Sequence, residues 1–304
     1  ALHLFQFLKH SDMKVSGFTF IRNAVLYGYP ITEAIRSILP LVDEMVVAVG
    51  NSDDATEDLI RNIGSDKIRI IRTVWDDNLR EGGRVLADET NKALDAIAPD
   101  ADWAFYLQGD EAVHEEDLGT IRQAMQRYVD CPEVEGLLFR YRHFYGSYDY
   151  VGTARQWYRH EIRIIRPRIG VRSYKDAQGF RIGDRKLNVV PIEAYIYHYG
   201  WVRPPRVQQR KLSTFHRLYH SDEWVKAHTP QAEAYDYSNI DMLKPFDGTH
   251  PAVMTEHIAR KDWDFVFDVT TSKPRGLKNK LLFFIERLTG KRLFEYRNYR
   301  IIKR

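Results

Sequence analysis

The sequence predicts an α/β fold, in which a mostly parallel sheet flanked by helices precedes a mixed or antiparallel second half and a C-terminal helical extension. Two observations predict this. From Lys14 onward, short β-branched or apolar runs alternate with longer stretches of helical periodicity, which is typical of βαβ units. After Val134 the runs shorten and become crowded with Tyr and Arg, which favours antiparallel or mixed pairing.

The first half contains four predicted strands, each an apolar run bounded by turn-forming residues. They are residues 15–21, 44–50, 67–74 and 102–109. A helix is predicted after each of the first three, and the helix after Pro30 carries Ile31, Ala34, Ile35 and Ile38 on one face. Asp54 is expected to cap the second helix, with Glu57 completing a capping box, and the third runs from about 82 to 97.

Further strands and two helices are predicted in the rest of the chain. The strands are 135–146, 160–167 and 189–202, the helices are 204–220 and 276–290, and residues 221–275 are rich in loops. These patterns divide the chain into a ligand-binding half (13–134), an acceptor-side half (135–220) and a C-terminal extension (221–304). Residues 1–12, before Met13, are interpreted as a native extension or a cloning remnant.

Composition excludes several classes of protein. With 304 residues, of which 44% are hydrophobic, the chain can bury one large core, with or without a subdomain. A net charge of only +3 gives no reason to expect nucleic acid as a partner. A single cysteine, Cys131, permits no internal disulfide, and no apolar run approaches the about 20 residues of a membrane span. We therefore expect a cytoplasmic protein without a standard signal peptide.

Polar and small residues follow all four strands of the first half. They are Arg22-Asn23, Gly50 to Asp54, Trp75 to Asn78, and Gln108 to Glu111. In parallel α/β sheets, ligands bind beyond the carboxyl ends of the strands, where these segments would share one rim. One such cluster is ordinary loop composition, but four together predict a polar ligand.

The acidic pair Asp110 and Glu111 closes the fourth strand. Mg²⁺ and Mn²⁺ prefer hard oxygen ligands, commonly one or two carboxylates plus phosphate oxygens. This pair therefore predicts a divalent cation carrying a diphosphate, and Gly109 favours that interpretation because it lets a large ligand approach the backbone. The alternative is a solvated acidic turn that caps the next helix.

Residues 14–118 resemble, in order, the family 2 glycosyltransferases. VSGFTFIRNA is similar to the family's first strand and loop, and VVAVGNSDDATEDLI to its Val-rich strand followed by Gly-Ser-x-Asp-x-Thr. The helix with Asn91-Lys92-Ala93-Leu94 and the segment WAFYLQGDEAVHEEDL resemble the family's third helix and its metal-binding Asp-x-Asp strand. The resemblance implies a GT-A-type, Rossmann-like sheet that binds a nucleotide-sugar donor.

The sequence departs from the family pattern at two places. Gln108 stands where Asp-x-Asp has its first carboxylate, which puts metal dependence in doubt. The Asp that recognises the base in many relatives falls at Val49 or Gly50. Asp54 and Thr56 match the pattern, but a structural role as helix cap and turn former is favoured for them.

The resemblance extends to a bacterial subgroup through DAQGFR, YIYHYGWVRPP and FDGTHP in the second half. It implies that His198 returns to the metal or the diphosphate, although a His among Tyr residues is often simply packed in the core. Arg203 suits bidentate phosphate contact, as does Arg84 unless its side chain is merely solvated. The expected donor-binding residues are Arg22, Asn23, Asn51, Asp76, Arg84, Gln108, Gly109, Glu111 and Arg203, with Asp110 and His198 as ligands of Mn²⁺ or Mg²⁺.

An inverting glycosyltransferase, the stereochemistry that the resemblance implies, needs a carboxylate to deprotonate the acceptor hydroxyl. That base must lie in the second half, where the carboxylates considered are Asp149, Glu161, Asp176, Asp184 and Glu193. Asp176 is the predicted base, because KDAQGFR occupies the stretch where relatives often carry an acidic motif. A plain loop carboxylate is the alternative.

The sequence thus predicts a glycosyltransferase (EC 2.4 type) acting on a saccharide or lipid-linked acceptor, in bacterial surface polysaccharide or glycoconjugate synthesis. Residues 276–304 pair apolar residues with an excess of lysine and arginine, so they could lie on an anionic membrane or pack on the domain with a solvated basic face. Two other functions stay open: a catalytically silent carbohydrate- or nucleotide-binding protein, and a nucleotidyltransferase. The segment FIRNAV lacks the Gly-rich loop typical of the latter.

Overall fold

The computed structural model describes residues 13–228 and 232–303, so the predicted extension at 1–12 lies outside the described residues. Four strands form the first half: β1 (Val15–Ile21), β2 (Glu44–Gly50), β3 (Ile68–Thr73) and β4 (Trp103–Tyr106). β1 pairs in parallel with β2 and β4, and β2 pairs in parallel with β3, giving the order β3-β2-β1-β4. The predicted parallel α/β half is confirmed.

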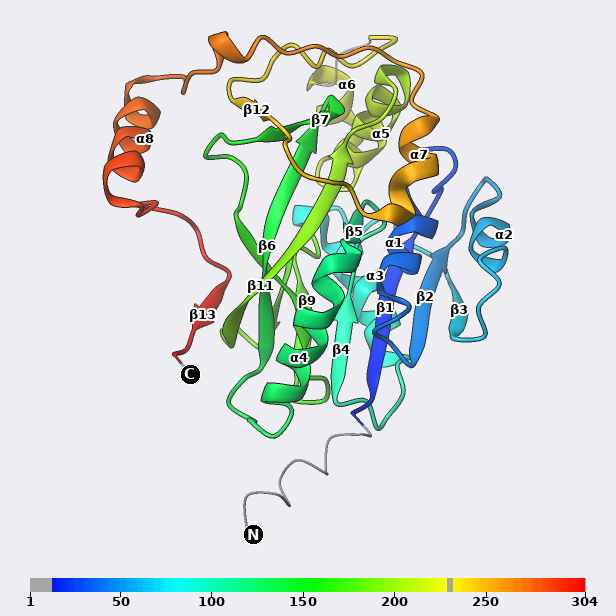
Figure 1. The fold of residues 1–304 in the computed structure, drawn as a ribbon. Helices are drawn as coiled ribbons and strands as arrows, with labels where there is room; N and C mark the ends of the chain where they lie inside the picture. The colour runs from blue at the N-terminus through cyan, green and yellow to red at the C-terminus, as the bar shows by residue number, and fades with distance from the viewer. Residues whose placement is uncertain (1–12, 229–231, 304) are drawn as a thin grey trace.

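Helices cover both faces of this parallel sheet (Figure 1). They are α1 (Ile31–Ile38), α2 (Thr56–Arg61), α3 (Arg84–Asp95) and α4 (Leu118–Tyr128). Successive side chains of β2 alternate between the two faces: Met45 and Val47 join the cluster that contains α1, whereas Val46 joins the cluster that contains α3. This two-sided burial explains why β1 and β2 read as continuous apolar runs.

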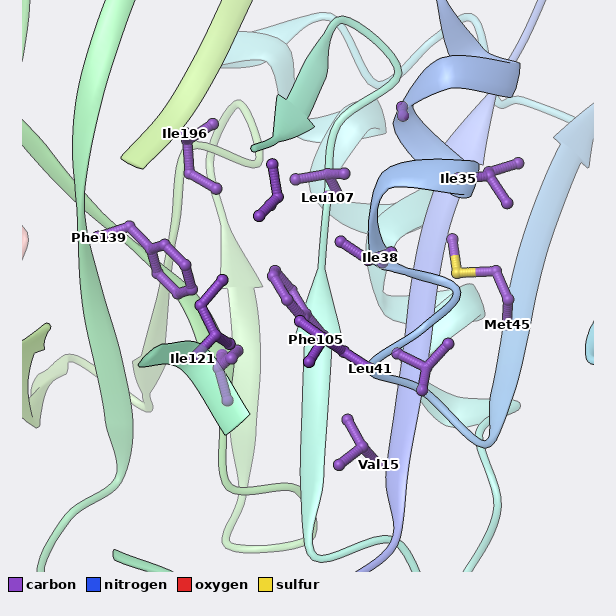
Figure 2. Packing of buried hydrophobic residues seen from close by; sticks show 14 of the residues in the cluster. Val15, Ile35, Ile38, Leu41, Met45, Phe105, Leu107, Ile121, Phe139 and Ile196 are labelled. Carbon is purple, nitrogen blue, oxygen red and sulfur yellow. The ribbon is translucent and has the colours of Figure 1, made fainter. Parts of the chain in front are cut away.

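The larger core lies between the sheet and the helices α1 and α4. Figure 2 shows Ile35 and Ile38 of α1 beside Met45, with Phe105 of β4 close to Ile121 of α4. All five side chains are essentially inaccessible to water. This packing fixes β4 against α1, and so it fixes where the chain leaves β4.

The second half continues the same sheet with mixed pairing. Its strands are β5 (Glu111–Val113), β6 (Gly136–Tyr145), β7 (Ser147–Gly152), β8 (His160–Ile165), β9 (Val171–Tyr174), β10 (Gly179–Ile182) and β11 (Arg185–Trp201). β8 is antiparallel to both β4 and β6, while β6 is parallel to β11. β10 then pairs antiparallel with both β11 and β9. The predicted mixed second half is confirmed.

Beyond β11 the chain is mainly helical and irregular. The elements are α5 (Pro205–Arg217), α6 (Asp222–His228), β12 (Leu243–Pro245), α7 (Thr255–Ala259), α8 (Leu277–Thr289) and β13 (Tyr299–Ile301), with short 3₁₀ turns elsewhere at 81–83, 115–117, 252–254 and 269–271. The predicted helices at 204–220 and 276–290 correspond to α5 and α8. Pro205 occupies the first turn of α5, and Gly290, with φ of 67°, ends α8.

The predicted strand 102–109 is too long. β4 ends at Tyr106, and a turn carries the chain through Gln108 and Asp110 into β5, which pairs antiparallel with β11. The turn closes because the Gln108 backbone N–H donates to the Glu111 carboxylate at 3.1 Å. As a result, Asp110 lies beside the C-terminal end of β11, where its backbone oxygen accepts from the Tyr199 N–H.

The predicted capping box is wrong. α2 begins at Thr56, and the Asp54 carboxylate accepts from the backbone N–H groups of Thr56 at 3.0 Å and Leu26 at 2.7 Å. Glu57 instead accepts from the guanidinium groups of Arg61 and Arg72. Asp54 therefore ties the loop after β1 to the start of α2, which agrees with the structural role predicted for it.

Candidate functional site

A cavity of about 790 Å³ opens at the carboxyl ends of β1 and β4, between the parallel sheet and α5. Seven of the predicted site residues line it: Arg22, Asn23, Gln108, Gly109, Asp110, Asp176 and His198. They come from the loop after β1, the turn after β4, the β9–β10 turn and β11. The chain thus brings polar groups from both halves of the sheet to one concave surface.

Five predicted donor-binding residues are not on the cavity wall: Asn51, Asp76, Arg84, Glu111 and Arg203. The Asn51 side chain accepts from the Trp75 N–H at 3.2 Å, and Asp76 accepts from the Asn78 N–H at 2.9 Å, so both hold the loop after β3. Arg84 is exposed at the start of α3. Sequence position alone could not separate these residues from neighbours that face the cavity, such as Asp77.

Glu111 lies behind the cavity in a fully buried ion pair. Its two carboxylate oxygens accept from Nε and Nη2 of Arg163, both at 2.8 Å, and neither side chain reaches solvent. The Tyr141 hydroxyl donates to the same carboxylate at 2.8 Å. With its oxygens engaged in this way, Glu111 shapes the turn that carries Asp110 rather than facing a ligand.

Two cationic side chains and a histidine lie close to Asp110. Its Oδ2 lies 3.2 Å from Lys211 Nζ and 3.9 Å from a guanidinium nitrogen of Arg203, and its Oδ1 lies 3.9 Å from His198 Nε2. Burial raises the pKa of Asp110, but Lys211, His198 and Arg203 outweigh it and hold the pKa well below its usual range. Burial lowers the pKa of Lys211 to about 7, with Arg203 lowering it further and Asp110 raising it.

Arg203 is buried beside Asp110 with unused hydrogen-bonding capacity. Its exposed fraction is 1%, and its guanidinium carbon lies 4.8 Å from the ring centre of Tyr29, as does Lys211 Nζ. Among the residues that the structure describes, none is a hydrogen-bond partner for any of its three guanidinium nitrogens. The nearest groups to its charge are the Asp110 carboxylate at 3.9 Å and the face of the Tyr29 ring.

His198 is oriented by a second histidine. Nε2 of His143 lies 2.8 Å from the carbonyl oxygen of Tyr158, which can only accept, so His143 carries its proton there. Nδ1 of His143 therefore accepts from Nδ1 of His198 at 2.9 Å. Burial lowers the pKa of both imidazoles, which keeps them neutral. This assignment leaves the lone pair of His198 on Nε2, the nitrogen nearer Asp110.

The residues around Asp110 do not fit a divalent cation well. The Gln108 side chain donates its amide N–H to the Ala177 carbonyl at 3.3 Å, and Asp110 Oδ2 already accepts from the Lys211 ammonium. A metal ion held by Asp110 and His198 would also lie close to two positive charges. Within residues 13–228 and 232–303 no group of three His, Cys, Asp or Glu side chains could hold a metal, so a cation here would depend on phosphate oxygens.

Trp75 occupies the place where a base-recognising carboxylate was sought. A side chain at Gly50 would collide with the Trp75 indole, so the glycine permits this packing. Trp75 lines the cavity, and the Arg22 guanidinium lies 5.6 Å from its ring centre. The Trp75 ring therefore packs beside Gly50 at the end of β2.

Asn23 and Gly109 line the cavity, but both have structural reasons for being there. Asn23 adopts φ of 56°, which asparagine tolerates, and its side chain bonds to Asp53 across the rim. A Cβ on Gly109 would lie 2.9 Å from Ile21 Cδ1. A side chain at Gly109 would therefore press on Ile21, a packing reason for glycine in addition to the one that the sequence suggested.

Residues of α5 form one wall of the cavity, and most of them were absent from the predicted site. They are Gln208, Lys211, Leu212, Thr214, Phe215 and Arg217. Gln208, Lys211, Leu212 and Phe215 recur at helical spacing and so share one face of the helix. This periodicity was the signal available in the sequence, but it does not show which partner that face covers.

Glu161, buried next to Gln178 on the cavity wall, should make stability depend on pH. Burial raises its pKa to about 7, although Arg163, the Ile162 N–H and Gln178 act in the opposite direction. Because the folded pKa exceeds the usual value, the stability contributed below about pH 4.5 is lost as pH rises through about 7. Between about pH 5 and pH 8 the free energy of unfolding should therefore fall by about 2–3 kcal/mol less in Glu161→Gln than in the wild type. Urea unfolding at both pH values measures this, and equal losses in the two proteins would contradict it.

Comparison with known proteins establishes no family. No family model matches the chain, and no curated protein matches it. Among solved structures, TarS of S. aureus is similar at 16% identity and a TM-score of 0.40, over 67% of this chain and 39% of that one. TarS 1-349 in complex with UDP is similar at 14% identity and a TM-score of 0.38, over 73% of this chain and 68% of that one. A third similar structure is glucosyl-3-phosphoglycerate synthase of Mycobacterium tuberculosis in complex with Mn²⁺, UDP and phosphoglyceric acid. Its identity is 20% and its TM-score 0.29, over 44% of this chain and 44% of that one. The chain spans less than half of the first and third structures, and TM-scores this low leave the function to be argued from the site itself.

Proposed function

We propose that the protein is a glycosyltransferase that binds a nucleotide-diphosphate sugar in the cavity beside Asp110. One observation carries the proposal: polar and aromatic residues from the ends of β1 and β4 and from the loop after β3 line a single cavity of about 790 Å³. That volume lies in the range of small-molecule sites, and the position is where parallel α/β sheets bind ligands. The resemblance of residues 14–118 to family 2 glycosyltransferases agrees with it.

The rim near β1 suits the nucleoside. Trp75 offers a ring face for a base, and Arg22 lies over that ring while its guanidinium donates to Asp77 at 3.1 Å and to the Asn51 carbonyl oxygen at 3.1 Å. Asp53, held by Asn23, also lines the cavity. The diphosphate would then extend toward Asp110, where the positive charge is concentrated.

Asp176 is the carboxylate we propose as the base that deprotonates the acceptor. Of the five second-half carboxylates considered, it lines the cavity and the other four do not. Glu161 is buried behind Gln178, and Glu193 pairs with Arg140 on the surface. Asp176 lies on the β9–β10 turn and interacts with the Tyr219 hydroxyl, so it faces the cavity from the acceptor-side half. Attack of the deprotonated hydroxyl on the anomeric carbon would release the nucleoside diphosphate with inversion.

A donor panel tests this function. Many glycosyltransferases hydrolyse their donor slowly when no acceptor is present, so we expect one nucleotide sugar to release free sugar and nucleoside diphosphate. Release of pyrophosphate from a nucleoside triphosphate and a sugar phosphate would instead indicate a nucleotidyltransferase. Binding of a nucleotide sugar with no release under any condition, including with candidate acceptors, would favour the catalytically silent protein.

We further propose that α8 docks on an anionic membrane surface, which would suit a lipid-linked acceptor. Four apolar side chains of α8 are strongly exposed: Leu277 (85%), Leu281 (60%), Phe284 (57%) and Leu288 (69%). At 100° per residue they form one stripe on the side opposite Leu282 and Glu286. Glu286, held by Arg155 at 2.7 Å, ties α8 to the body of the protein.

The positive charge around this stripe indicates that it binds an anionic surface. From Lys273 to the C-terminus there are eleven lysines and arginines against two glutamates, and Lys280 and Arg287 flank the apolar stripe. Figure 1 shows α8 at the periphery of the molecule. An amphipathic helix with this composition suits the interface of an anionic bilayer. No helix in the described part of the chain is both long and apolar enough to cross a membrane.

Vesicle sedimentation measures this contact. We expect binding to vesicles that contain phosphatidylglycerol and little binding to pure phosphatidylcholine. The double variant Leu281→Ser, Phe284→Ser should weaken it about tenfold or more, because it removes two large apolar side chains. The exposed Val266→Ser serves as a control. Equal binding to both kinds of vesicle, or no effect of the double variant, would contradict the proposal.

A further inference from the structure

The pair Lys211 and Arg203 presents more positive charge than Asp110 neutralises. Both side chains lie within 3.9 Å of the Asp110 carboxylate, so one negative charge faces two positive ones when Lys211 is protonated. Two of the three arginines on the cavity wall differ in this respect, while the third, Arg217, is exposed on α5. Arg22 pairs with Asp77 at 3.1 Å, and Arg80 pairs with Asp222 at 2.8 Å. A surplus of positive charge is therefore concentrated at Asp110.

Hydrogen-bonding capacity is also left over at this place. An ammonium group has three N–H donors, and Lys211 uses two, on Asp110 Oδ2 and on the Gly200 carbonyl oxygen, both at 3.2 Å. Arg203 is 1% exposed, and its guanidinium makes no hydrogen bond within the described residues. Lys211 lines the cavity directly, while Arg203 lies behind it beside Tyr29. Lys211 therefore has one N–H left for an anionic acceptor in the cavity, and Arg203 adds positive charge behind it.

We propose that the protein neutralises the donor diphosphate with Lys211 and Arg203 and binds it without a divalent metal. The inference rests on the proposed function. Asp110 holds the two cations in place, Lys211 donates its third N–H to a phosphate oxygen, and Arg203 adds its charge from behind. Gln108 agrees with this arrangement, because its side chain is directed to the Ala177 carbonyl and supplies no second carboxylate for a metal.

Calorimetric titration of the full chain with UDP, GDP, CDP, dTDP and ADP tests the proposal, with each titration run once in EDTA and once in Mn²⁺. We expect one nucleotide to bind with dissociation constants that agree within about twofold in the two buffers. Binding in Mn²⁺ that is lost in EDTA would overturn the metal-free proposal and leave the nucleotide site intact. No binding in either buffer would overturn both the proposal and the donor site on which it rests.

Variants of two adjacent residues on α5 identify the cation. We expect Lys211→Met to weaken binding in EDTA by about tenfold or more, since a charge-assisted hydrogen bond to phosphate is lost. Arg210→Met removes the same charge from the exposed side of the helix and should change the affinity by less than about twofold. Equal affinities of Lys211→Met and the wild type would overturn the role of Lys211.

Electron paramagnetic resonance of Mn²⁺ with the wild-type protein tests the absence of a bound metal without any variant. With nucleotide and protein together, the free Mn²⁺ signal should fall no further than with nucleotide alone. A larger fall, indicating a protein-bound ion, would overturn the proposal even if Lys211→Met failed to fold.

Discussion

Replacing Glu111 by glutamine is expected to lower the free energy of unfolding by about 3–5 kcal/mol, because it leaves the buried Arg163 guanidinium without its counter-charge. Both side chains are fully inaccessible to water, and the pair is joined by two hydrogen bonds of 2.8 Å. A carboxylate left alone could take up a proton, but a guanidinium does not lose one at neutral pH. Urea denaturation of wild type and variant measures the difference.

Two further variants show whether the unpaired charge of Arg163 causes that loss of stability. In the double variant Glu111→Leu, Arg163→Met no charge is left unpaired, so part of the stability should return, while the Tyr141 hydroxyl and the Gln108 N–H lose their acceptor. Arg172→Met breaks an exposed pair with Asp95 and should cost no more than about 1 kcal/mol. A Glu111→Gln protein as stable as Arg172→Met would mean that the buried pair does not hold the turn after β4.

Asp110→Ala is expected to lower donor hydrolysis about 100-fold or more. Without the carboxylate, Lys211 and Arg203 repel each other and lose the group that orients them toward the diphosphate. Removing one preorganised electrostatic element from an active site typically costs factors of this size. The rate of nucleoside diphosphate release, measured well below the melting temperature of the variant, tests it.

The control for Asp110 is a carboxylate outside the cavity. Asp95→Ala changes an exposed residue at the end of α3, and its hydrolysis rate should stay within about twofold of wild type. An Asp110→Ala protein that turns over as fast as Asp95→Ala would place the chemistry elsewhere in the molecule.

The sequence predicted the parallel half of the fold well because its signals are local. β1 and β2 are uninterrupted apolar runs, and helices cover both of their faces, so their boundaries matched those predicted. The prediction was wrong at the end of the fourth strand, which was expected to run through Gly109. Its end depends on a hydrogen bond from Gln108 to Glu111 and on pairing of β5 with β11, a strand that lies far along the chain.

The structure brings seven of the predicted site residues to one cavity, but the charges around them could not be predicted. Asp110 and His198 were expected together, and the structure places Nε2 of His198 3.9 Å from Asp110. The sequence does not reveal that Lys211 would come from α5 to neutralise Asp110, or that Glu111 would be matched by Arg163. Such pairings depend on which helix face or strand register meets the turn, and no local pattern encodes them.

The most direct test of a donor site in this cavity is calorimetric titration of the wild-type protein and a Trp75→Ala variant with the nucleoside diphosphate that binds. One nucleotide per chain is the result expected for the wild type, and this expectation concerns the site as a whole. We also expect an affinity about tenfold weaker for the variant, because a base stacked on an aromatic ring loses that contact. Absence of binding by any nucleoside diphosphate, or binding that the change at Trp75 leaves untouched, would contradict a donor site in this cavity.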